Sequence, residues 1–224
     1  LVVEIGTGSG WLSHGILERF EQSRVLGLDG SERMLAETGR VVGEFGDRAT
    51  LRSFELRDLS WIRDLKEPVR AFVSCLVVHH LDGTAKRRLY GELFAALETG
   101  GALLLADVIE PASPHANRYF QRLYEDDVRA KSLADTGALD VYQRFVSLEW
   151  NLFRYPDPID MPSKILDHID WLREAGFTGV EVFWARSGHA LYGGYKRLPV
   201  ELQPHRVADE RAEQADHHDN GKQM

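Results

Sequence analysis

The chain opens on a short apolar run that leads directly into three alternating glycines. Residues 2–5 contain three branched apolar side chains, Gly6, Gly8 and Gly10 follow, and a helical pattern comes next. Glycines let the backbone turn tightly and let a ligand approach where a Cβ atom would collide with it. The N-terminal amides of the following helix then point toward that ligand. This combination predicts a nucleotide-type cofactor site at the end of the first strand of an α/β fold.

The spacing of the glycines indicates which cofactor this is. A dinucleotide-binding G-x-G-x-x-G fingerprint would place its third glycine at position 11, which is Trp11. A dehydrogenase is therefore the least favoured alternative. The pattern from Glu4 to Gly10 is instead acidic-x-G-x-G-x-G, and it resembles motif I of the class I S-adenosylmethionine (SAM) methyltransferases.

The residues at the ends of the later predicted strands also resemble this family. Apolar runs end at Asp29, at Asp58 and at the pair His79-His80, and a further run over 102–108 contains Asp107. Strands that alternate with helical patterns indicate a parallel sheet, whose carboxyl ends share one edge. The resemblance extends from residue 1 to about residue 110 and resumes near residues 172–177.

The resemblance implies an α/β fold with a doubly wound, mostly parallel seven-stranded sheet in the order 3-2-1-4-5-7-6. Residues 180–185 and 190–195 are strand-like and flank Ser187-Gly188, which predicts a C-terminal antiparallel hairpin. Ser31 and Ser163 are predicted N-caps of helices. A third helix is predicted over 84–97, stopped by Gly100-Gly101.

The segment 110–162 is too long for a simple connection and is rich in aromatic residues. In the family this position carries a substrate cap, so we expect helices over the cleft, with some of Tyr119, Tyr124, Trp150 and Phe153 facing the cofactor methyl group. The alternative is that these aromatics fill the core between cap and sheet. We expect residues 1–198 to form the methyltransferase domain. The polar tail 199–224 is predicted to be disordered.

Cofactor contacts follow from the resemblance, position by position. Glu4 would reach the methionine ammonium through water, Asp29 the ribose hydroxyls and Asp58 the adenine, while Cys75 would contribute its backbone carbonyl. For Asp29 and Asp58 a turn or helix-capping role is the alternative. The complete predicted set is Glu4, Gly6, Thr7, Gly8, Gly10, Asp29, Gly30, Asp58, Leu59 and Cys75.

Candidate catalytic residues are His79, His80 and Asp107, which follow strands four and five at the ligand-binding edge. An imidazole there can take a proton from a hydroxyl or amine acceptor. We expect His79 to be more structural and His80 to lie nearer the cleft, because consecutive side chains leave a strand in opposite directions. No metal site is predicted, since His217-His218 lies in the polar tail without a helical His-x-x-x-His or cysteine partner.

The composition bears on the partners and the location of the protein. The net charge of −8 argues against a nucleic-acid partner, and the single cysteine suits a cytoplasmic protein. No apolar stretch is long enough for a membrane span. The sequence therefore predicts a SAM-dependent methyltransferase for a small or medium-sized organic acceptor. A tRNA-modifying transferase of the carboxy-SAM type and a non-catalytic SAM-binding module are the alternatives. Because Leu1 already lies inside the first strand, where family members have preceding helices, we expect a piece of a longer protein.

Overall fold

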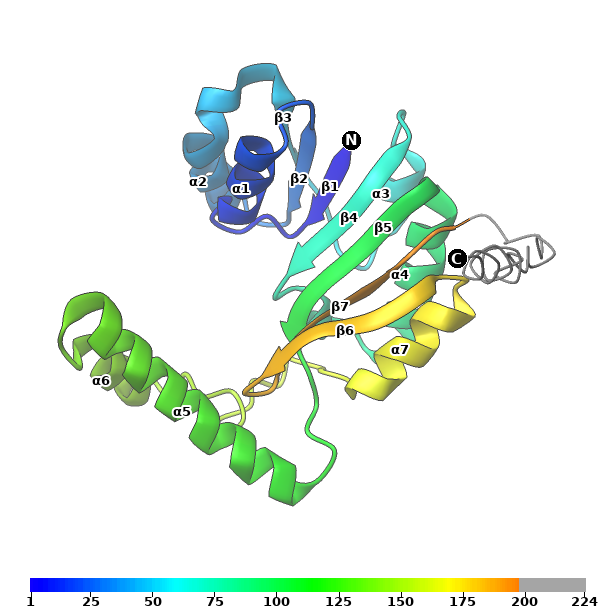
Figure 1. Cartoon of the computed structure of the whole chain (residues 1–224). Helices are drawn as coiled ribbons and strands as arrows, with labels where there is room; N and C mark the ends of the chain where they lie inside the picture. Colours follow the sequence, from blue (N-terminus) through cyan, green and yellow to red (C-terminus); the bar gives the residue numbers. More distant parts are fainter. Residues whose placement is uncertain (198–224) are drawn as a thin grey trace, which may run out of the picture.

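A seven-stranded sheet forms the centre of the computed structural model, which describes residues 1–197 (Figure 1). The predicted tail 199–224 lies outside the described residues. The strands are β1 Val2–Ile5, β2 Val25–Asp29, β3 Ala49–Ser53, β4 Val69–Cys75, β5 Leu97–Val108, β6 Thr178–Arg186 and β7 His189–Tyr195. Their order is β3-β2-β1-β4-β5-β7-β6, which confirms the prediction.

The pairing explains where the carboxyl ends of the strands meet. Strands β1 to β5 are parallel to their neighbours, while β7 runs antiparallel between β5 and β6. The arrowheads of β1, β4 and β5 therefore point to the same edge of the sheet (Figure 1). Every candidate site residue that follows one of these strands lies along this edge, as expected of a doubly wound sheet.

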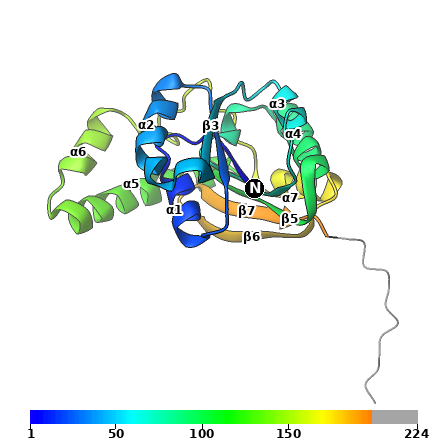
Figure 2. The same ribbon diagram turned by 90° about the horizontal axis from the view of Figure 1, so that it is seen from above.

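Helices cover the two faces of the sheet. They are α1 Trp11–Arg19, α2 Glu32–Val42, α3 Ser60–Arg63, α4 Gly83–Ala96, α5 Pro114–Thr136, α6 Asp140–Ser147 and α7 Ile165–Glu174, with 3-10 turns at Gly43–Arg48 and Val78–His80. Seen from above, α1 and α2 lie together and α3, α4 and α7 form a separate group (Figure 2). Ser31 caps α2 by accepting a hydrogen bond from the amide of Met34, as predicted.

The alternation of side chains along the strands produces two cores. Val25 packs with Leu17 of α1 and Val42 of α2, whereas its neighbour Leu26 belongs to a larger core with α3, α4 and α7. Successive residues of a strand point to opposite faces, so a single strand can serve both cores. The larger core includes the buried residues Phe72, Leu89, Leu93, Leu103 and Leu172.

Two predicted helix boundaries are wrong. Gly100-Gly101 does not stop α4, since the chain is already extended at Leu97 and both glycines lie inside β5. A Cβ atom on Gly101 would lie 2.9 Å from the carbonyl oxygen of Arg70, so close backbone approach explains this glycine. Ser163 does not cap α7, whose N-cap is Lys164. The hydroxyl of Ser163 accepts a hydrogen bond from the Lys86 ammonium instead.

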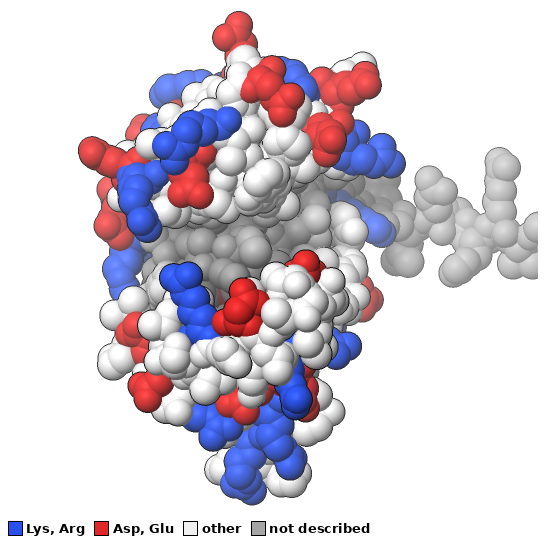
Figure 3. Space-filling model, turned by 90° about the vertical axis from the view of Figure 1, so that its left-hand side faces the viewer, with Lys and Arg blue, Asp and Glu red and all other residues white. Residues whose placement is uncertain are grey.

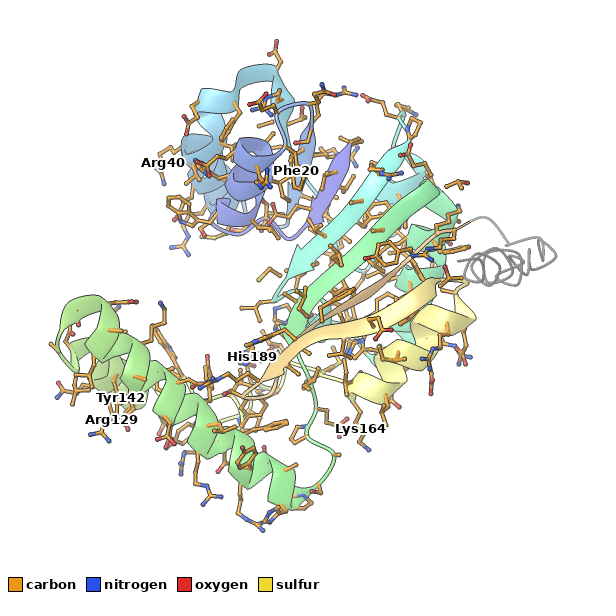
Figure 4. The ribbon with its side chains drawn as sticks, viewed as in Figure 1. Phe20, Arg40, Arg129, Tyr142, Lys164 and His189 are labelled. Atoms are coloured by element: carbon orange, nitrogen blue, oxygen red, sulfur yellow. The ribbon has the colours of Figure 1, made fainter. Side chains whose placement is uncertain are left out.

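The insertion between β5 and α7 is helical, as expected, and α5 and α6 form a hairpin that projects from the carboxyl edge (Figure 1). His189 lies where this hairpin meets the β6–β7 turn (Figure 4). Tyr124 and Phe153 pack against each other and against His189. Phe153 is buried, and a Cβ atom on Gly188 would lie 1.9 Å from its ring. These two aromatics therefore fill the joint between insertion and sheet, which is the alternative stated above.

The remaining two aromatics singled out in the insertion are exposed to solvent. Tyr119 is 50% exposed and Trp150 is 56% exposed. Within residues 1–197, none of the helices combines the length and the apolar character that crossing a bilayer would require.

Candidate functional site

The glycine loop joins β1 to α1 with three residues in the left-handed region. The φ angles are 73° at Gly6, 52° at Gly8 and 86° at Gly10. Packing explains two of these glycines, because an added Cβ atom would lie 2.2 Å from Val77 at Gly6 and 2.8 Å from Thr38 at Gly10. At Gly8 an added Cβ atom would meet nothing within 4 Å. The protein itself thus leaves open space beside the middle glycine, where a ligand can approach the backbone.

Polar contacts hold this loop against β2 and α2. The amide of Gly8 donates to Asp29 Oδ2 at 2.9 Å, and the Thr38 hydroxyl donates to the carbonyl oxygen of Gly8 at 2.8 Å. Asp29 Oδ1 also accepts from the amide of Ser31 at 2.9 Å. The half-buried Asp29 carboxylate therefore orders both the loop and the start of α2, and each of its oxygens retains a lone pair for a further donor. Gly30 beside it is exposed.

Glu4 lies behind the loop and is almost fully buried. Its carboxyl group accepts hydrogen bonds from the hydroxyls of Ser13 and Thr7, and Thr7 is buried as well. Burial raises the pKa of Glu4 from 4.5 to about 7, although the hydroxyl of Ser13 and that of Thr7 lower it. The two side chains predicted to bind the cofactor here are thus enclosed by the protein, and they fix the loop from behind.

The raised pKa of Glu4 predicts a pH-dependent stability. Because the folded pKa exceeds the ordinary value of 4.5, ionisation of Glu4 should destabilise the fold progressively from about pH 4.5 to pH 7, by about 3 kcal/mol in total. Glu4→Gln keeps an acceptor for Ser13 and Thr7 but cannot ionise. Its free energy of unfolding, relative to wild type, should therefore rise by about that amount between pH 4.5 and pH 8.

Urea denaturation at several pH values would measure this difference. The control Glu18→Gln removes an exposed carboxylate of α1 and should track the wild-type profile. Parallel profiles for wild type and Glu4→Gln would show that the carboxyl group of Glu4 does not titrate in this range.

The segments after β3 and β4 border the same edge. Asp58 is exposed and accepts from the amide and hydroxyl of Ser60 at 3.0 and 2.8 Å, so it forms the turn before α3, and Leu59 beside it is buried. Cys75 ends β4 with an exposed side chain. Leu76 follows with a φ of 57°, a strained value for a branched residue, and strain of this kind is concentrated at functional sites.

His79 and Asp107 form a buried pair at the ends of β4 and β5. Asp107 Oδ1 lies 2.6 Å from His79 Nδ1 and also accepts from the amide of Val108 at 2.8 Å. Asp107 Oδ2 accepts from the amide of His79 at 2.9 Å. Since a carboxylate can only accept, Nδ1 carries the proton and the lone pair of His79 resides on Nε2. Asp107 thereby sets the orientation and the tautomer of His79.

The chain returning from the insertion closes over this pair. Asp160 Oδ1 lies 3.5 Å from His79 Nε2 and 3.1 Å from His80 Nδ1. The amide of Met161 donates to the carbonyl oxygen of His79 at 2.7 Å, and the buried Lys86 donates to the carbonyl oxygen of Met161. Burial lowers the pKa of Lys86 to about 8. His80 is more exposed than His79, which agrees with the expected ranking, but the reason given for it is wrong: both histidines lie in the 3-10 turn Val78–His80 and not in a strand.

Figure 3 looks onto this edge and shows a hollow between the part containing α1 and α2 and the part containing α5 and α6. A separate cavity of about 570 Å³ lies between α5 and the β6–β7 turn. Its lining contains no residue of the glycine loop, so it is not the cofactor site. The cavity is largely aromatic and apolar, with Tyr119, Phe120, Leu123, Trp184, His189 and Ile109 among its lining residues.

Three residues of the site were not predicted from the sequence. Thr38 lies within α2 and belongs to no motif, yet its hydroxyl holds the glycine loop by donating to the carbonyl oxygen of Gly8. Val77 packs against Gly6, and the apolar run in which it lies gave no sign of this contact. Asp160 is about 80 residues from the histidines it meets, and the loop around it carries no motif.

Comparison with known proteins finds a family that matches the N-terminal part of the chain and a curated relative. Residues 2–101 match the family described as "Methyltransferase domain". A carboxy-S-adenosyl-L-methionine synthase from Chromohalobacter salexigens is 27% identical over 172 residues, which are 76% of this chain and 58% of that protein. The acidic-x-G-x-G-x-G loop from Glu4 to Gly10 lies within the residues that match the family.

Solved structures share the fold at lower identity. An O-methyltransferase family protein from Burkholderia thailandensis is 14% identical with a TM-score of 0.61, over 88% of this chain and 50% of the other. An O-methyltransferase family 2 protein from Planctomyces limnophilus, in complex with apigenin, is 16% identical with a TM-score of 0.58, over 87% and 49%. The chain thus spans about half the length of these structures.

Proposed function

We propose that the chain is a class I S-adenosylmethionine-dependent methyltransferase and that it transfers a methyl group from SAM to a small or medium-sized organic acceptor. The observation that carries this proposal is the glycine loop. Its middle residue, Gly8, faces open space although its neighbours Gly6 and Gly10 are tightly packed. A loop whose backbone is free on one side, beside the Asp29 carboxylate, fits an adenosyl ligand.

The residues present fit SAM in charge and position. Asp29 can accept hydrogen bonds from two ribose hydroxyls while keeping its contacts to Gly8 and Ser31. The strained turn at Leu76 directs the backbone after Cys75 toward the edge at which β1 and β4 end. Glu4, enclosed behind the loop, has a raised pKa that a nearby ammonium group would lower again.

Bound SAM supplies a methyl group that its sulfonium already activates. What remains for the protein is to hold donor and acceptor in line and to exclude water, and such positioning can contribute roughly 7–11 kcal/mol. The glycine loop and Asp29 would hold the donor. We assign proton removal from the acceptor to His80, whose ring is the more exposed of the two histidines, with His79 and Asp107 positioning the chain around it.

The insertion forms one wall of a cavity whose lining fits an aromatic acceptor. The cavity between α5 and the β6–β7 turn has a volume of about 570 Å³, within the usual range for small-molecule sites. Its aromatic lining would stack against a flat ring. The O-methyltransferase family 2 protein with the same fold was solved with apigenin, a flat aromatic molecule. A methyl-transfer screen over phenolic acceptors is the direct way to identify the substrate. The single cysteine of the sequence supports a cytoplasmic location.

A second candidate function is favoured by the curated relative. That protein is named a carboxy-SAM synthase, and its match covers 76% of this chain. The chain would then form or use carboxy-SAM in place of SAM. Titration with both compounds separates the two candidates, because a carboxy-SAM enzyme should bind carboxy-SAM or its reaction products more tightly than a methyltransferase does.

Calorimetric titration with SAM, S-adenosylhomocysteine and NAD tests the cofactor assignment. We expect the two adenosyl ligands to compete for one site and NAD not to bind. Asp29→Ala should weaken both by roughly 10- to 100-fold, since it removes charge-assisted hydrogen bonds to the ribose.

The control for this substitution is Asp126→Ala, which removes an exposed carboxylate of α5 and should leave the affinities unchanged. Thermal melts of Asp29→Ala should confirm that it folds. Tighter binding of NAD than of SAM, or unchanged SAM affinity in folded Asp29→Ala, would refute the assignment.

A further inference from the structure

Three metal-ligating atoms converge beside the carboxyl end of β4. His79, His80 and Asp160 each offer one ligand atom, and these atoms all lie within 4.8 Å of one another. Oδ1 of Asp160 lies near Nε2 of His79 and Nδ1 of His80. The two measured nitrogen-to-oxygen distances are 3.5 and 3.1 Å. Ligands about 2.1 Å from a tetrahedral zinc ion are separated by roughly 3.4 Å, so these spacings match the edges of such a coordination shell.

The tautomer of His79 leaves the lone pair of Nε2 available to bind a metal ion. Asp107 accepts the Nδ1 proton at 2.6 Å, which leaves the lone pair on Nε2, the atom that faces Asp160. A carboxylate behind a histidine is the usual outer-shell partner of a metal-ligating imidazole. Asp107 itself accepts hydrogen bonds from the amides of His79 and Val108, so the orientation of the His79 ring is set before any ion binds.

His80 provides an independent indication. Its Nδ1 atom is buried and has no hydrogen-bond partner among the described residues, although a carboxylate oxygen of Asp160 lies 3.1 Å away. The oxygen is therefore close to the nitrogen but off the line that a hydrogen bond requires. Two ligands of one ion show this relation, because each directs its lone pair at the ion and not at the other ligand. An orphaned buried nitrogen in a polar cluster is explained by an ion that satisfies it.

We propose that His79, His80 and Asp160 bind a divalent first-row transition-metal ion, with Asp107 as the outer-shell partner of His79. Two imidazoles and one carboxylate favour Zn²⁺, Co²⁺ or Fe²⁺ over Mg²⁺ and Ca²⁺, which prefer oxygen ligands. Three protein ligands leave at least one coordination position open. The His80 side chain, 41% exposed, gives solvent access to that position.

The ion would also tie the insertion to the sheet. Asp160 lies in the segment that returns from α6 toward α7, whereas both histidines follow β4. Near it, the backbone of Met161 already bonds to His79 and to Lys86. Metal binding would add a bond between this segment and β4. It needs neither SAM nor an acceptor, so the inference goes beyond the proposed function and can be tested apart from it.

Calorimetric titration of the chelator-treated protein with Zn²⁺, and optical titration with Co²⁺, test the site. We expect one ion per chain, a tetrahedral Co²⁺ spectrum, and a melting temperature that rises with Zn²⁺ concentration. Asp160→Asn should weaken Zn²⁺ at least 10-fold, and Asp107→Asn roughly 10- to 100-fold through the outer shell. Because Asp160 lies on a partly exposed loop, its variant should stay folded.

Two controls make the test specific. His14 and Glu44 form another imidazole–carboxylate pair at 3.2 Å, without a third ligand in the described part of the chain, so Glu44→Gln should bind Zn²⁺ as wild type does. Joint replacement of His205, His217 and His218 by alanine should also leave one ion bound. Equal Zn²⁺ affinity of wild type and Asp160→Asn, loss of binding on removal of those three histidines, or no saturable binding would each overturn the proposal.

Discussion

Gly8→Leu is expected to lower the affinity for SAM and S-adenosylhomocysteine by roughly 100-fold or more, which corresponds to about 2.7 kcal/mol. The new side chain would start in the open space beside the loop, where the structure shows no protein atom within 4 Å of an added Cβ. In the proposed complex the ligand occupies that space. The fold should survive, since only the left-handed conformation at φ 52° is strained, at a cost of about 1–2 kcal/mol.

Gly137→Leu is the matched control for this substitution. Gly137 caps α5 with a φ of 70°, and an added Cβ atom there also meets nothing within 4 Å. It should therefore show a similar loss of stability in chemical denaturation but no loss of ligand affinity in calorimetry. If both variants bind SAM like wild type, the open side of the loop is not the cofactor site.

His80→Gln is expected to lower turnover by roughly 10²- to 10⁴-fold with little change in melting temperature, because a general base contributes about that much. The lost activity should be the part that rises with pH around neutrality, where imidazoles change charge. Initial rates across pH, measured with an acceptor identified by the screen, would show this. Unchanged turnover in a folded His80→Gln protein would exclude His80 as the base.

His79→Gln should act mainly on stability. It removes the imidazole that the buried Asp107 carboxylate contacts at 2.6 Å, and removal of one member of a buried pair costs about 3 kcal/mol or more. Thermal melts of both histidine variants would separate the two roles. Since an imidazole that binds an ion through Nδ1 carries its proton on Nε2, His80 can act as a base only in the ion-free protein, so a rate that depends on His80 as a base should fall when Zn²⁺ is added and recover on treatment with a chelator.

The placement of the candidate residues could be predicted because it rests on local sequence, whereas the strand order was predicted from the resemblance to a family. The glycine spacing after residues 2–5 set the first turn, and apolar runs marked the following strands up to Asp107. Parallel strands separated by helices bring their carboxyl ends to one edge, so Asp29 and His79 were expected there. Helix ends were predicted less well. Gly100-Gly101 reads as a stop signal but lies in β5, because the approach of Arg70 requires it there.

The roles of individual side chains were decided by tertiary contacts. Phe153 belongs to an aromatic-rich insertion and was expected to face the substrate, yet it fills the joint beneath Gly188. Thr38 has the spacing of a core residue, yet its hydroxyl holds the glycine loop. In both cases the sequence pattern specifies that a residue faces inward, and only the packing of distant elements specifies what it meets there.

By itself, then, the sequence determined the glycine loop and the edge at which the candidate residues gather, since these depend on spacing along the chain, while the order of strands came from the family that this spacing resembles. Only the tertiary structure decided that Asp160 returns from the insertion to meet His79 and His80, and that Asp107 fixes the tautomer of His79. The physical reason is that hydrogen bonds and metal–ligand bonds act over about 2–3 Å, whatever the separation of their partners along the chain. No spacing rule links residues 80 and 160, so their encounter depends on how the whole fold packs.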